Sequence, residues 1–344
     1  MGQVVDSVIT ALHIKTIRRQ TVRSLPSLRP FACVLPFLLV PLCALSQEFP
    51  VKPVNFIVQY AAGSGADQLA RVIAETVHKG TDVNFVIRNM PGALGAIGTS
   101  ALVRSPADGY TIGICSASVN SIANSVTKSL PYDTVADFTF IEPLAAYTYV
   151  VTVAPELGIG SLDALVKQAT AKPETFSYAY ANATAQVLSA ALTKQLDMKV
   201  LPVPYKSSQE GLGDISQNRV SFGVTDMGVT VPMVKSGRVK ALVVISSQRS
   251  ISLPDVPTLS ELGRAPISVV AWAGACGPKN MSPEAVAWLR TQVRKARGEG
   301  ATLEKFKLLG LDPLELGSVS FADFVVAQSK LWTAAAKDAG IRPD

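Results

Sequence analysis

The chain has 344 residues, of which 48% are hydrophobic and 17% are charged, and its length suggests about two domains. Five of its basic residues and one of its acidic residues lie in the first 46 positions, so the remaining 27 basic and 25 acidic residues nearly balance. A near-neutral body without a basic stripe argues against nucleic-acid binding, and the ordinary glycine and proline content argues against a disordered chain.

The first 46 residues have the order of charged and apolar residues that is typical of an export signal. Basic residues come first, and an apolar run over 31–45 follows. Two prolines interrupt this run, which is shorter than the roughly 20 apolar residues of a membrane span. Ala44-Leu45-Ser46 places small residues at the −3 and −1 positions of a cleavage site. We therefore expect a periplasmic protein whose signal peptide, residues 1–46, is cleaved near Ser46.

Beyond residue 46, short apolar runs alternate with helical patterns. The first unit is a strand over Val54–Val58, followed by the loop Ala61–Gly65 and a helix from about Ala66. Helices are also expected through Gly98 and Val103, around Leu188–Leu192, from Ser207, from Ser282, near Leu303–Leu309 and from near Ser320. Further strands are expected over residues 83–87, 110–115, 149–153, 176–180, 200–205, 220–225, 241–245 and 269–276. This alternation predicts an α/β protein with largely parallel sheets and helices on both sheet faces.

Histidine and cysteine are too scarce for several common kinds of active site. His78 is the single histidine after residue 46, which excludes a histidine-based metal cluster there. No nucleophile elbow and no phosphate-binding P-loop motif occurs in the sequence. We therefore expect no metal, no cofactor and no enzymatic activity. Cys115 and Cys276 are interpreted as buried free thiols, although an oxidising compartment would also allow a disulfide.

Two strand–loop–helix junctions are candidates for an anion site. At Gly63-Ser64-Gly65 the backbone can approach a ligand closely, because two of the three residues lack a Cβ. The helix that follows presents unpaired N–H groups and a partial positive charge, which suit a carboxylate or a phosphate. The loop at 181–185 offers the same geometry, with the Thr184 hydroxyl as a further donor. The alternative for each loop is that it serves only the turn.

Taken together, the motifs of this chain resemble those of the Bug family. These proteins are the extracytoplasmic solute receptors that are associated with tripartite tricarboxylate transporters. The resemblance covers nearly all of residues 50–344. In the family's order, it is carried by Ile57–Gly63 with Asp67, Arg88–Ala93, Pro106–Thr111, Leu130–Asp133, Val203–Lys206, Ser236–Leu242 and Leu253–Thr258.

The resemblance implies a two-lobed type II periplasmic-binding-protein fold with parallel-rich sheets flanked by helices. Residues 47–148 and 266–344 would form one lobe, and residues 149–265 would form the other. The lobes would close over a small carboxylate that is held mainly by backbone amides and ordered water. Transporter membrane subunits or a sensor protein are the expected protein partners, nucleic acid is not expected as a partner, and we expect a monomer.

The resemblance also implies which residues bind the ligand. They lie in the first loop, after the third strand and in the second loop: Gly63, Ser64, Gly65, Ala66, Asp67, Ser116, Ser118, Ala183 and Thr184. Tyr205 and Asp226 end strands and are further candidates; Asp226 could contact either the ligand or the opposite lobe. For Asp67, the favoured alternative is that it stabilises the start of its own helix.

Both loops depart from the family's pattern. The family usually has two adjacent glycines and then Ser-Thr, whereas this chain has Gly63-Ser64-Gly65-Ala66. The second loop is usually Gly-x-Gly-Ser, whereas here it is Ala181-Asn182-Ala183-Thr184. Added Cβ atoms narrow the approach of the backbone to a ligand, so we expect a changed ligand or a weaker grip on it. A ligand sensor for a signalling partner, or an enzyme on the same scaffold, are the alternative functions.

Overall fold

A computed structural model describes residues 49–173 and 175–343, all within one compact unit, Gln47–Asp344. The predicted export signal and its cleavage site lie outside the described residues. Within these ranges, none of the helices combines the length and the hydropathy that spanning a bilayer requires.

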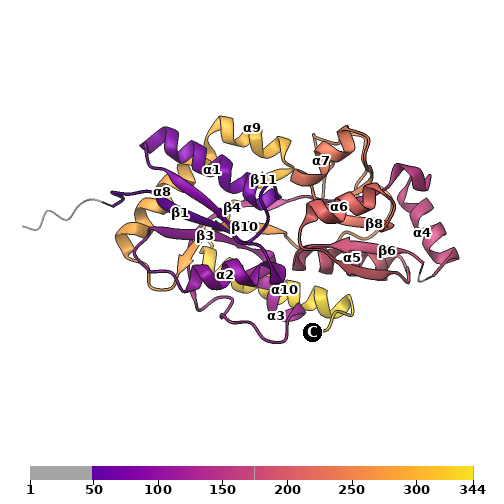
Figure 1. Cartoon of the computed structure of the whole chain (residues 1–344), viewed down its shortest axis with the longest axis horizontal. Helices are drawn as coiled ribbons and strands as arrows, with labels where there is room; N and C mark the ends of the chain where they lie inside the picture. Colours follow the sequence, from indigo (N-terminus) through magenta and orange to yellow (C-terminus); the bar gives the residue numbers. More distant parts are fainter. Residues whose placement is uncertain (1–48, 174, 344) are drawn as a thin grey trace, which may run out of the picture. The chain divides into compact units, whose positions relative to one another are not determined.

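Six strands form the first sheet, in the order β11-β4-β10-β3-β1-β2 (Figure 1). β1 pairs in parallel with β2 and β3, whereas β10 pairs antiparallel with β3 and β4. The strands of this sheet are β1 (Val54–Val58), β2 (Phe85–Asn89), β3 (Thr111–Ser116), β4 (Phe138–Tyr147), β10 (Trp272–Pro278) and β11 (Leu311–Pro313).

Five strands form the second sheet, in the order β7-β6-β8-β5-β9. β6 pairs in parallel with β7 and β8, whereas β5 pairs antiparallel with β8 and β9. The strands of this sheet are β5 (Tyr149–Val153), β6 (Ser177–Tyr180), β7 (Leu201–Pro204), β8 (Phe222–Asp226) and β9 (Lys240–Ile245). Both sheets are therefore mixed, with antiparallel pairs at the strands that connect the two lobes.

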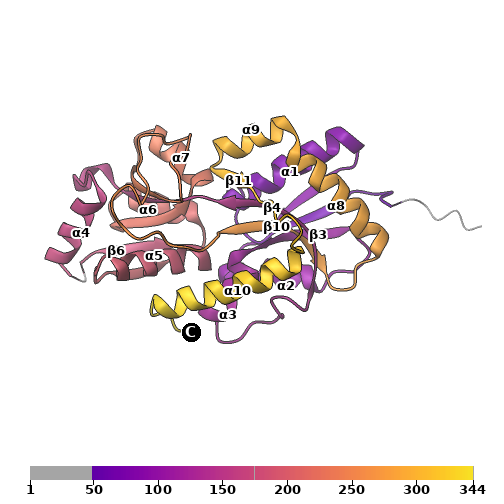
Figure 2. The same ribbon diagram turned by 180° about the vertical axis from the view of Figure 1, so that it is seen from behind.

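Helices cover both faces of the first sheet. One face packs against α1 (Gly65–Thr81), α8 (Pro283–Gly298) and α9 (Gly300–Leu308), and the other against α2 (Ala96–Val103) and α10 (Phe321–Asp338) (Figures 1 and 2). The second lobe carries α4 (Leu162–Ala171), α5 (Ala183–Gln195), α6 (Ser208–Ser216) and α7 (Met227–Lys235). The shorter helical segments are η1 (Ala93–Gly95), η2 (Ala117–Ile122), α3 (Ala123–Val126) and η3 (Pro155–Leu157).

The side chains of β1 show why this strand is buried on both faces. Val54, Phe56 and Val58 join the apolar cluster beneath α1 and α8, whereas Ile57 points into the cluster on the opposite face. A continuous apolar run is what a central strand between two helical layers requires. The second of these clusters continues from Trp332 of α10 into the second lobe, so α10 packs against both lobes.

The chain crosses between the sheets at two places. The first crossing is immediate, since β4 ends at Tyr147 and β5 begins at Tyr149. The second runs through residues 246–271, between β9 and β10. The Thr148 N–H donates to the Gly310 carbonyl (3.0 Å), and the Thr148 carbonyl accepts from Met227 N–H (3.0 Å). These crossings give the two-lobed architecture, while the lobe limits at 148/149 and 265/266 remain a prediction.

Several elements follow local signals, and one does not. The Ser207 and Ser282 hydroxyls cap their helices by accepting hydrogen bonds from Glu210 N–H (3.2 Å) and Ala285 N–H (3.1 Å). The strand β4 was not expected, because Glu142-Pro143 lies in its middle and proline disfavours central strands. A register shift beside this proline accommodates it. Cys115 and Cys276 are both buried free thiols.

Candidate ligand-binding site between the two sheets

A pocket with a cavity volume of about 50 Å³ lies between the lobes. The pocket is therefore narrow and suited to a small ligand. Both sheets contribute to its lining, through the loops and helix starts at strand ends. The lining residues are Tyr60, Ala61, Ser64, Gly65, Ala66, Ser116, Ser118, Tyr147, Tyr149, Ala181, Asn182, Thr184, Lys206–Gln209, Asp226, Ala271 and Trp272.

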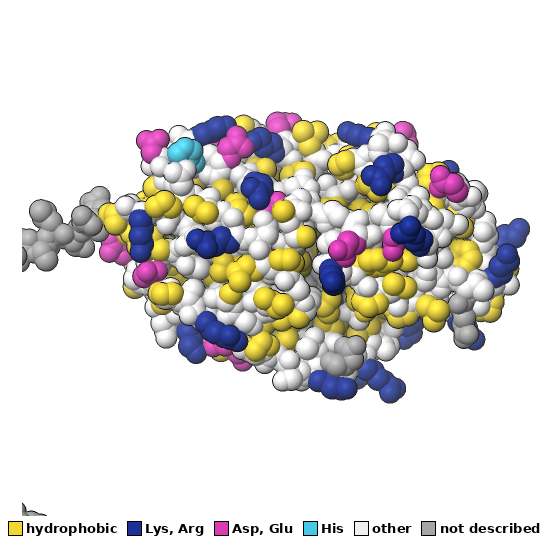
Figure 3. Space-filling view, viewed as in Figure 1, with side chains coloured by type: hydrophobic (Ala, Val, Ile, Leu, Met, Phe, Trp, Pro, Cys, Tyr) yellow, Lys and Arg dark blue, Asp and Glu magenta, His cyan; other side chains and the backbone are white. Residues whose placement is uncertain are grey.

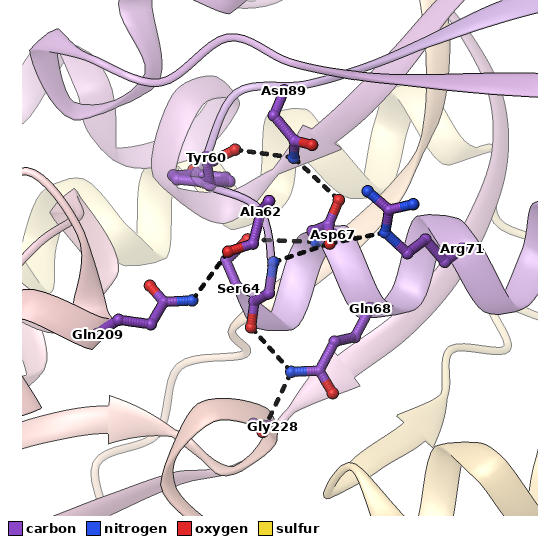
Figure 4. A network of polar contacts seen from close by, with 10 residues as sticks. Tyr60, Ala62, Ser64, Asp67, Gln68, Arg71, Asn89, Gln209 and Gly228 are labelled. Carbon is purple, nitrogen blue, oxygen red and sulfur yellow. Dashed lines mark hydrogen bonds and ion pairs between the residues drawn. The ribbon is translucent and has the colours of Figure 1, made fainter.

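The Asp67 side chain holds the first loop in place (Figure 4). The Asp67 carboxylate accepts hydrogen bonds from Gly63 N–H (2.8 Å), Asn89 Nδ2 (2.9 Å) and Arg71 Nε (2.9 Å). Burial alone would raise the pKa of this carboxyl, but the three hydrogen bonds outweigh it and lower the pKa. Asp67 is thus an ionised brace that fixes the loop from behind.

This bracing leaves two amides at the start of α1 for a ligand. Ser64 is the N-cap, and its hydroxyl accepts from Asp67 N–H (3.2 Å). The first two helical residues, Gly65 and Ala66, have no intrahelical acceptor for their N–H groups. Within residues 49–173 and 175–343, no other acceptor is found for either amide. Both residues line the pocket.

The second loop presents one such amide rather than two. Asn182 caps α5 by accepting from Ala185 N–H (2.8 Å). The Ala183 N–H is already used, because it donates to the Ser118 hydroxyl of the first lobe (2.9 Å). The Thr184 N–H therefore remains as a donor at the pocket, and the Thr184 hydroxyl lies beside Tyr149 in the same lining. Ser118 joins the two lobes through this hydrogen bond.

Two glutamines link the lobes beside the first loop (Figure 4). Gln209 of α6 donates to the Ala62 carbonyl of the first loop (3.3 Å). Gln68 of α1 donates to the Gly228 carbonyl at the start of α7 (3.2 Å). Both hydrogen bonds join the first lobe to the second.

Aromatic side chains form the inner wall of the pocket. Tyr60 shares a 3.3 Å hydrogen bond with Ser116, while the buried Tyr147 hydroxyl has no hydrogen-bond partner among the described residues. Burial raises the pKa of Tyr60, and it raises those of Tyr147 and Tyr149 strongly, with Asp226 contributing to the latter two. All three tyrosines therefore stay neutral near pH 7.

Asp226 is an acidic group within the lining. Asp226 is the last residue of β8 and is only 6% exposed. Its side chain caps α7 by accepting a hydrogen bond from Val229 N–H (3.4 Å). Burial raises the pKa of this carboxyl to about 6, even though neighbouring backbone amides oppose the shift. Asp226 also approaches the first lobe, because its Oδ1 lies 2.3 Å from the position that a Cβ on Gly65 would occupy.

The structure brings seven of the eleven predicted site residues into one lining. These are Ser64, Gly65, Ala66, Ser116, Ser118, Thr184 and Asp226. The other four are outside the lining: Gly63 donates its N–H to Asp67, Ala183 donates its N–H to Ser118, and the Tyr205 hydroxyl donates to Asp214 (2.8 Å). Ligand contact by any of the eleven remains a prediction. The aromatic wall and Gln209 were not anticipated.

Charged side chains do not form a broad patch of one sign on the face shown in Figure 3. On the face shown in Figure 3, lysine and arginine side chains are interspersed with acidic ones. Lys206 is the basic residue of the pocket lining. Across residues 49–173 and 175–343, no group of three or more His, Cys, Asp or Glu side chains is arranged to hold a metal ion.

Comparison with known proteins decides the family. Residues 69–341 match the profile of the tripartite tricarboxylate transporter family receptors. The chain belongs to this family. Its relatives include Protein BugT of Bordetella pertussis, which is 28% identical over 300 residues, covering 86% of this chain and 92% of BugT. A UPF0065 protein of Bordetella bronchiseptica is 30% identical over 233 residues, covering 67% of this chain and 68% of that protein. The resemblance to the Bug receptors is thereby confirmed.

Solved structures confirm the fold of this Bug-family receptor. The periplasmic binding protein BugD is 26% identical and superposes with a TM-score of 0.81, covering 86% of this chain and all of BugD. R. palustris Rpa4515, solved with adipate, is also 26% identical, with a TM-score of 0.83 over 86% of this chain and all of that one. The two-lobed periplasmic-binding-protein fold is therefore established.

Proposed function

We propose that this receptor binds a small carboxylate in the cleft between its lobes and holds it mainly by backbone amides and ordered water. One observation carries the proposal. The amides of Gly65 and Ala66 at the start of α1, and of Thr184 at the start of α5, line the same pocket from opposite lobes.

Helix electrostatics explain how this pocket would hold an anion. The N-terminus of a helix carries a partial charge of about +0.5, together with unpaired N–H donors that point along the axis. α1 has 17 residues and α5 has 13, so both are long enough to develop this charge. Two such ends can balance one carboxylate without an arginine. The hydroxyls of Ser116 and Thr184 supply further donors from the lining.

Closure would be coupled to binding because the anion sites belong to different lobes. The Ser118–Ala183 hydrogen bond and the two glutamine contacts exist only when the lobes meet. A ligand bridging α1 and α5 adds contacts to that same arrangement. The closed form would then be recognised by transporter membrane subunits on the outer side of the membrane.

The comparisons support the ligand class and the location. The related Rpa4515 was solved with adipate, a dicarboxylate. Membership of a receptor family of tripartite tricarboxylate transporters supports extracytoplasmic uptake as the role of this chain. We expect the receptor to act as a monomer and without catalysis.

A ligand screen on the purified, exported protein tests this function. Mono-, di- and tricarboxylates and amino acids are tested by thermal shift, and hits are measured by titration calorimetry. A ligand present at 100 times its Kd stabilises the protein by about 2.7 kcal/mol. We expect at least one carboxylate to bind saturably and remain unchanged. Absence of binding by every carboxylate, or turnover of the ligand, would contradict the proposal.

A further inference from the structure

The Asp226 carboxylate places a negative charge inside a pocket that is built to bind an anion. It is 6% exposed, and its Oδ1 accepts a long hydrogen bond of 3.4 Å from Val229 N–H. The amides of Asp226 and Gly228 also face it. No ion pair to Asp226 is found within residues 49–173 and 175–343. The protein therefore supplies amide dipoles to this carboxylate but no cation.

The side chains that interact electrostatically with Asp226 are neutral phenols, and Lys206, the basic residue of the pocket lining, forms no ion pair with it among the described residues. Tyr147 ends β4 and Tyr149 begins β5, the charge of Asp226 acts on both, and burial keeps each of these phenols protonated. From α1, Gly65 lies beside Asp226, because a Cβ added to Gly65 would overlap the Asp226 carboxylate. The Tyr147 hydroxyl is buried and has no hydrogen-bond partner among the described residues, so it too is available to a ligand.

Asp226 lies directly beside the proposed carboxylate anchor. Its Oδ1 is 2.3 Å from the position of a hypothetical Cβ on Gly65, whose N–H is one of the anchoring amides. A carboxylate bound to Gly65 and Ala66 would thus be a close neighbour of the Asp226 carboxylate. Two carboxylates in contact cannot both be ionised at low cost. A cation between them removes that conflict.

We propose that the ligand is a small α-amino acid, whose ammonium group lies between Asp226 and Tyr147 while its carboxylate lies on the helix amides. This inference rests on the proposed function and specifies its ligand class. An ammonium group has three donors, and the Asp226 carboxylate and the Tyr147 hydroxyl oxygen are acceptors without a strong partner. Because Gly65, which would bind the ligand carboxylate, lies beside Asp226, the ligand's ammonium group must be close to its own carboxylate. An α-amino group meets this requirement, whereas an ω-amino group lies several bonds further away.

Matched ligand pairs on the wild-type protein test the inference. The twenty proteinogenic amino acids and their desamino carboxylates, such as alanine with propanoate and aspartate with succinate, are titrated by calorimetry. 2-Aminobutyrate is compared with 4-aminobutyrate. A charge-assisted hydrogen bond in a buried site corresponds to about 10- to 100-fold in affinity. We expect at least one amino acid to bind that much more tightly than its desamino partner, and 2-aminobutyrate to bind more tightly than 4-aminobutyrate.

Variants assign the effect to this carboxylate. Asp226→Asn keeps a helix-capping side chain but removes the charge, so it should weaken amino-acid binding about 10- to 100-fold and leave or improve desamino binding. Tyr147→Phe should also weaken amino-acid binding, but by a smaller factor than Asp226→Asn does. Asp255→Asn, in an exposed loop, is the control and should change neither the affinity for the amino acid nor the affinity for its desamino partner.

The outcomes distinguish this inference from the proposed function. If a desamino carboxylate binds as tightly as its amino acid, the receptor function stands and the inference is overturned. If no carboxylate of either kind binds, both are overturned. The comparison of ligand pairs uses the wild-type protein alone, so it decides the question even if Asp226→Asn fails to fold.

Discussion

A single methyl group at Gly65 should prevent the cleft from closing while leaving each lobe folded. The Cβ of Gly65→Ala would lie 2.3 Å from Asp226 Oδ1, 3.0 Å from its Cγ and 3.4 Å from Tyr147 Cε1. The shortest of these falls about 1.1 Å below an ordinary contact of 3.4 Å. Because Asp226 belongs to the second lobe and Gly65 to the first, opening of the lobes relieves the overlap.

The expected magnitude follows from that overlap. Overpacking of this kind costs about 1–3 kcal/mol, which corresponds to a Kd raised about 5- to 150-fold. The open, ligand-free protein should keep its Tm or gain slightly, since alanine is the better helix former. Calorimetric titration with the tightest carboxylate from the screen measures the Kd. Gly80→Ala is the matched control on the same helix, because nothing lies within 4 Å of its added Cβ. A Gly65→Ala protein that binds with the wild-type Kd would refute the reasoning.

Three further substitutions test other parts of the site. Ser118→Ala leaves the buried Ala183 N–H without its 2.9 Å acceptor, so ligand binding should weaken by about 1–3 kcal/mol in calorimetry; an unchanged Kd would exclude this lobe-to-lobe bond from closure. Asp67→Asn weakens the acceptor of Gly63 N–H and should lower the free energy of unfolding in urea by about 1–3 kcal/mol at pH 7; an equally stable variant would show that the brace is dispensable. Asp226→Asn should raise the Tm of the ligand-free protein at pH 7.5. The pKa of Asp226 is raised to about 6 in the folded protein, so folding favours the protonated carboxyl. The stability gained from protonation is complete below the ordinary pKa near 4 and is lost as the pH rises through about 6. The Tm difference between variant and wild type should therefore vanish towards pH 4, and a difference independent of pH would contradict the burial of this charge.

The first strand–loop–helix unit could be predicted because each of its parts carries a local signal. The apolar run of β1 was predicted at the residues where it occurs, and α1 begins at Gly65, one residue before the expected Ala66. A serine cap, a first-turn aspartate and apolar residues at helical spacing act within a few residues of one another. Such features depend little on the rest of the fold.

The partners of this unit could not be predicted, because they come from distant parts of the chain. The Ala183 amide is used by Ser118, which lies 65 positions away in the other lobe. Tyr147 and Trp272 reach the pocket because β4 and β10 pair antiparallel near the lobe crossing. Glu142 and Pro143 hid β4 from a pattern search; in the structure, the Glu142 carboxylate is paired with Arg294 at 2.9 Å. Tertiary pairing of this kind leaves no local signal.

The most direct measurement of the central claim is an NMR titration of the ¹⁵N-labelled protein with the tightest carboxylate from the screen. Hydrogen bonds from main-chain amides to an anion move the amide proton resonances downfield. We expect saturable downfield shifts for the amide protons of Gly65, Ala66 and Thr184, with one common Kd. Saturable binding that leaves these three amides unmoved, while resonances of lysine or arginine side chains shift instead, would contradict that claim.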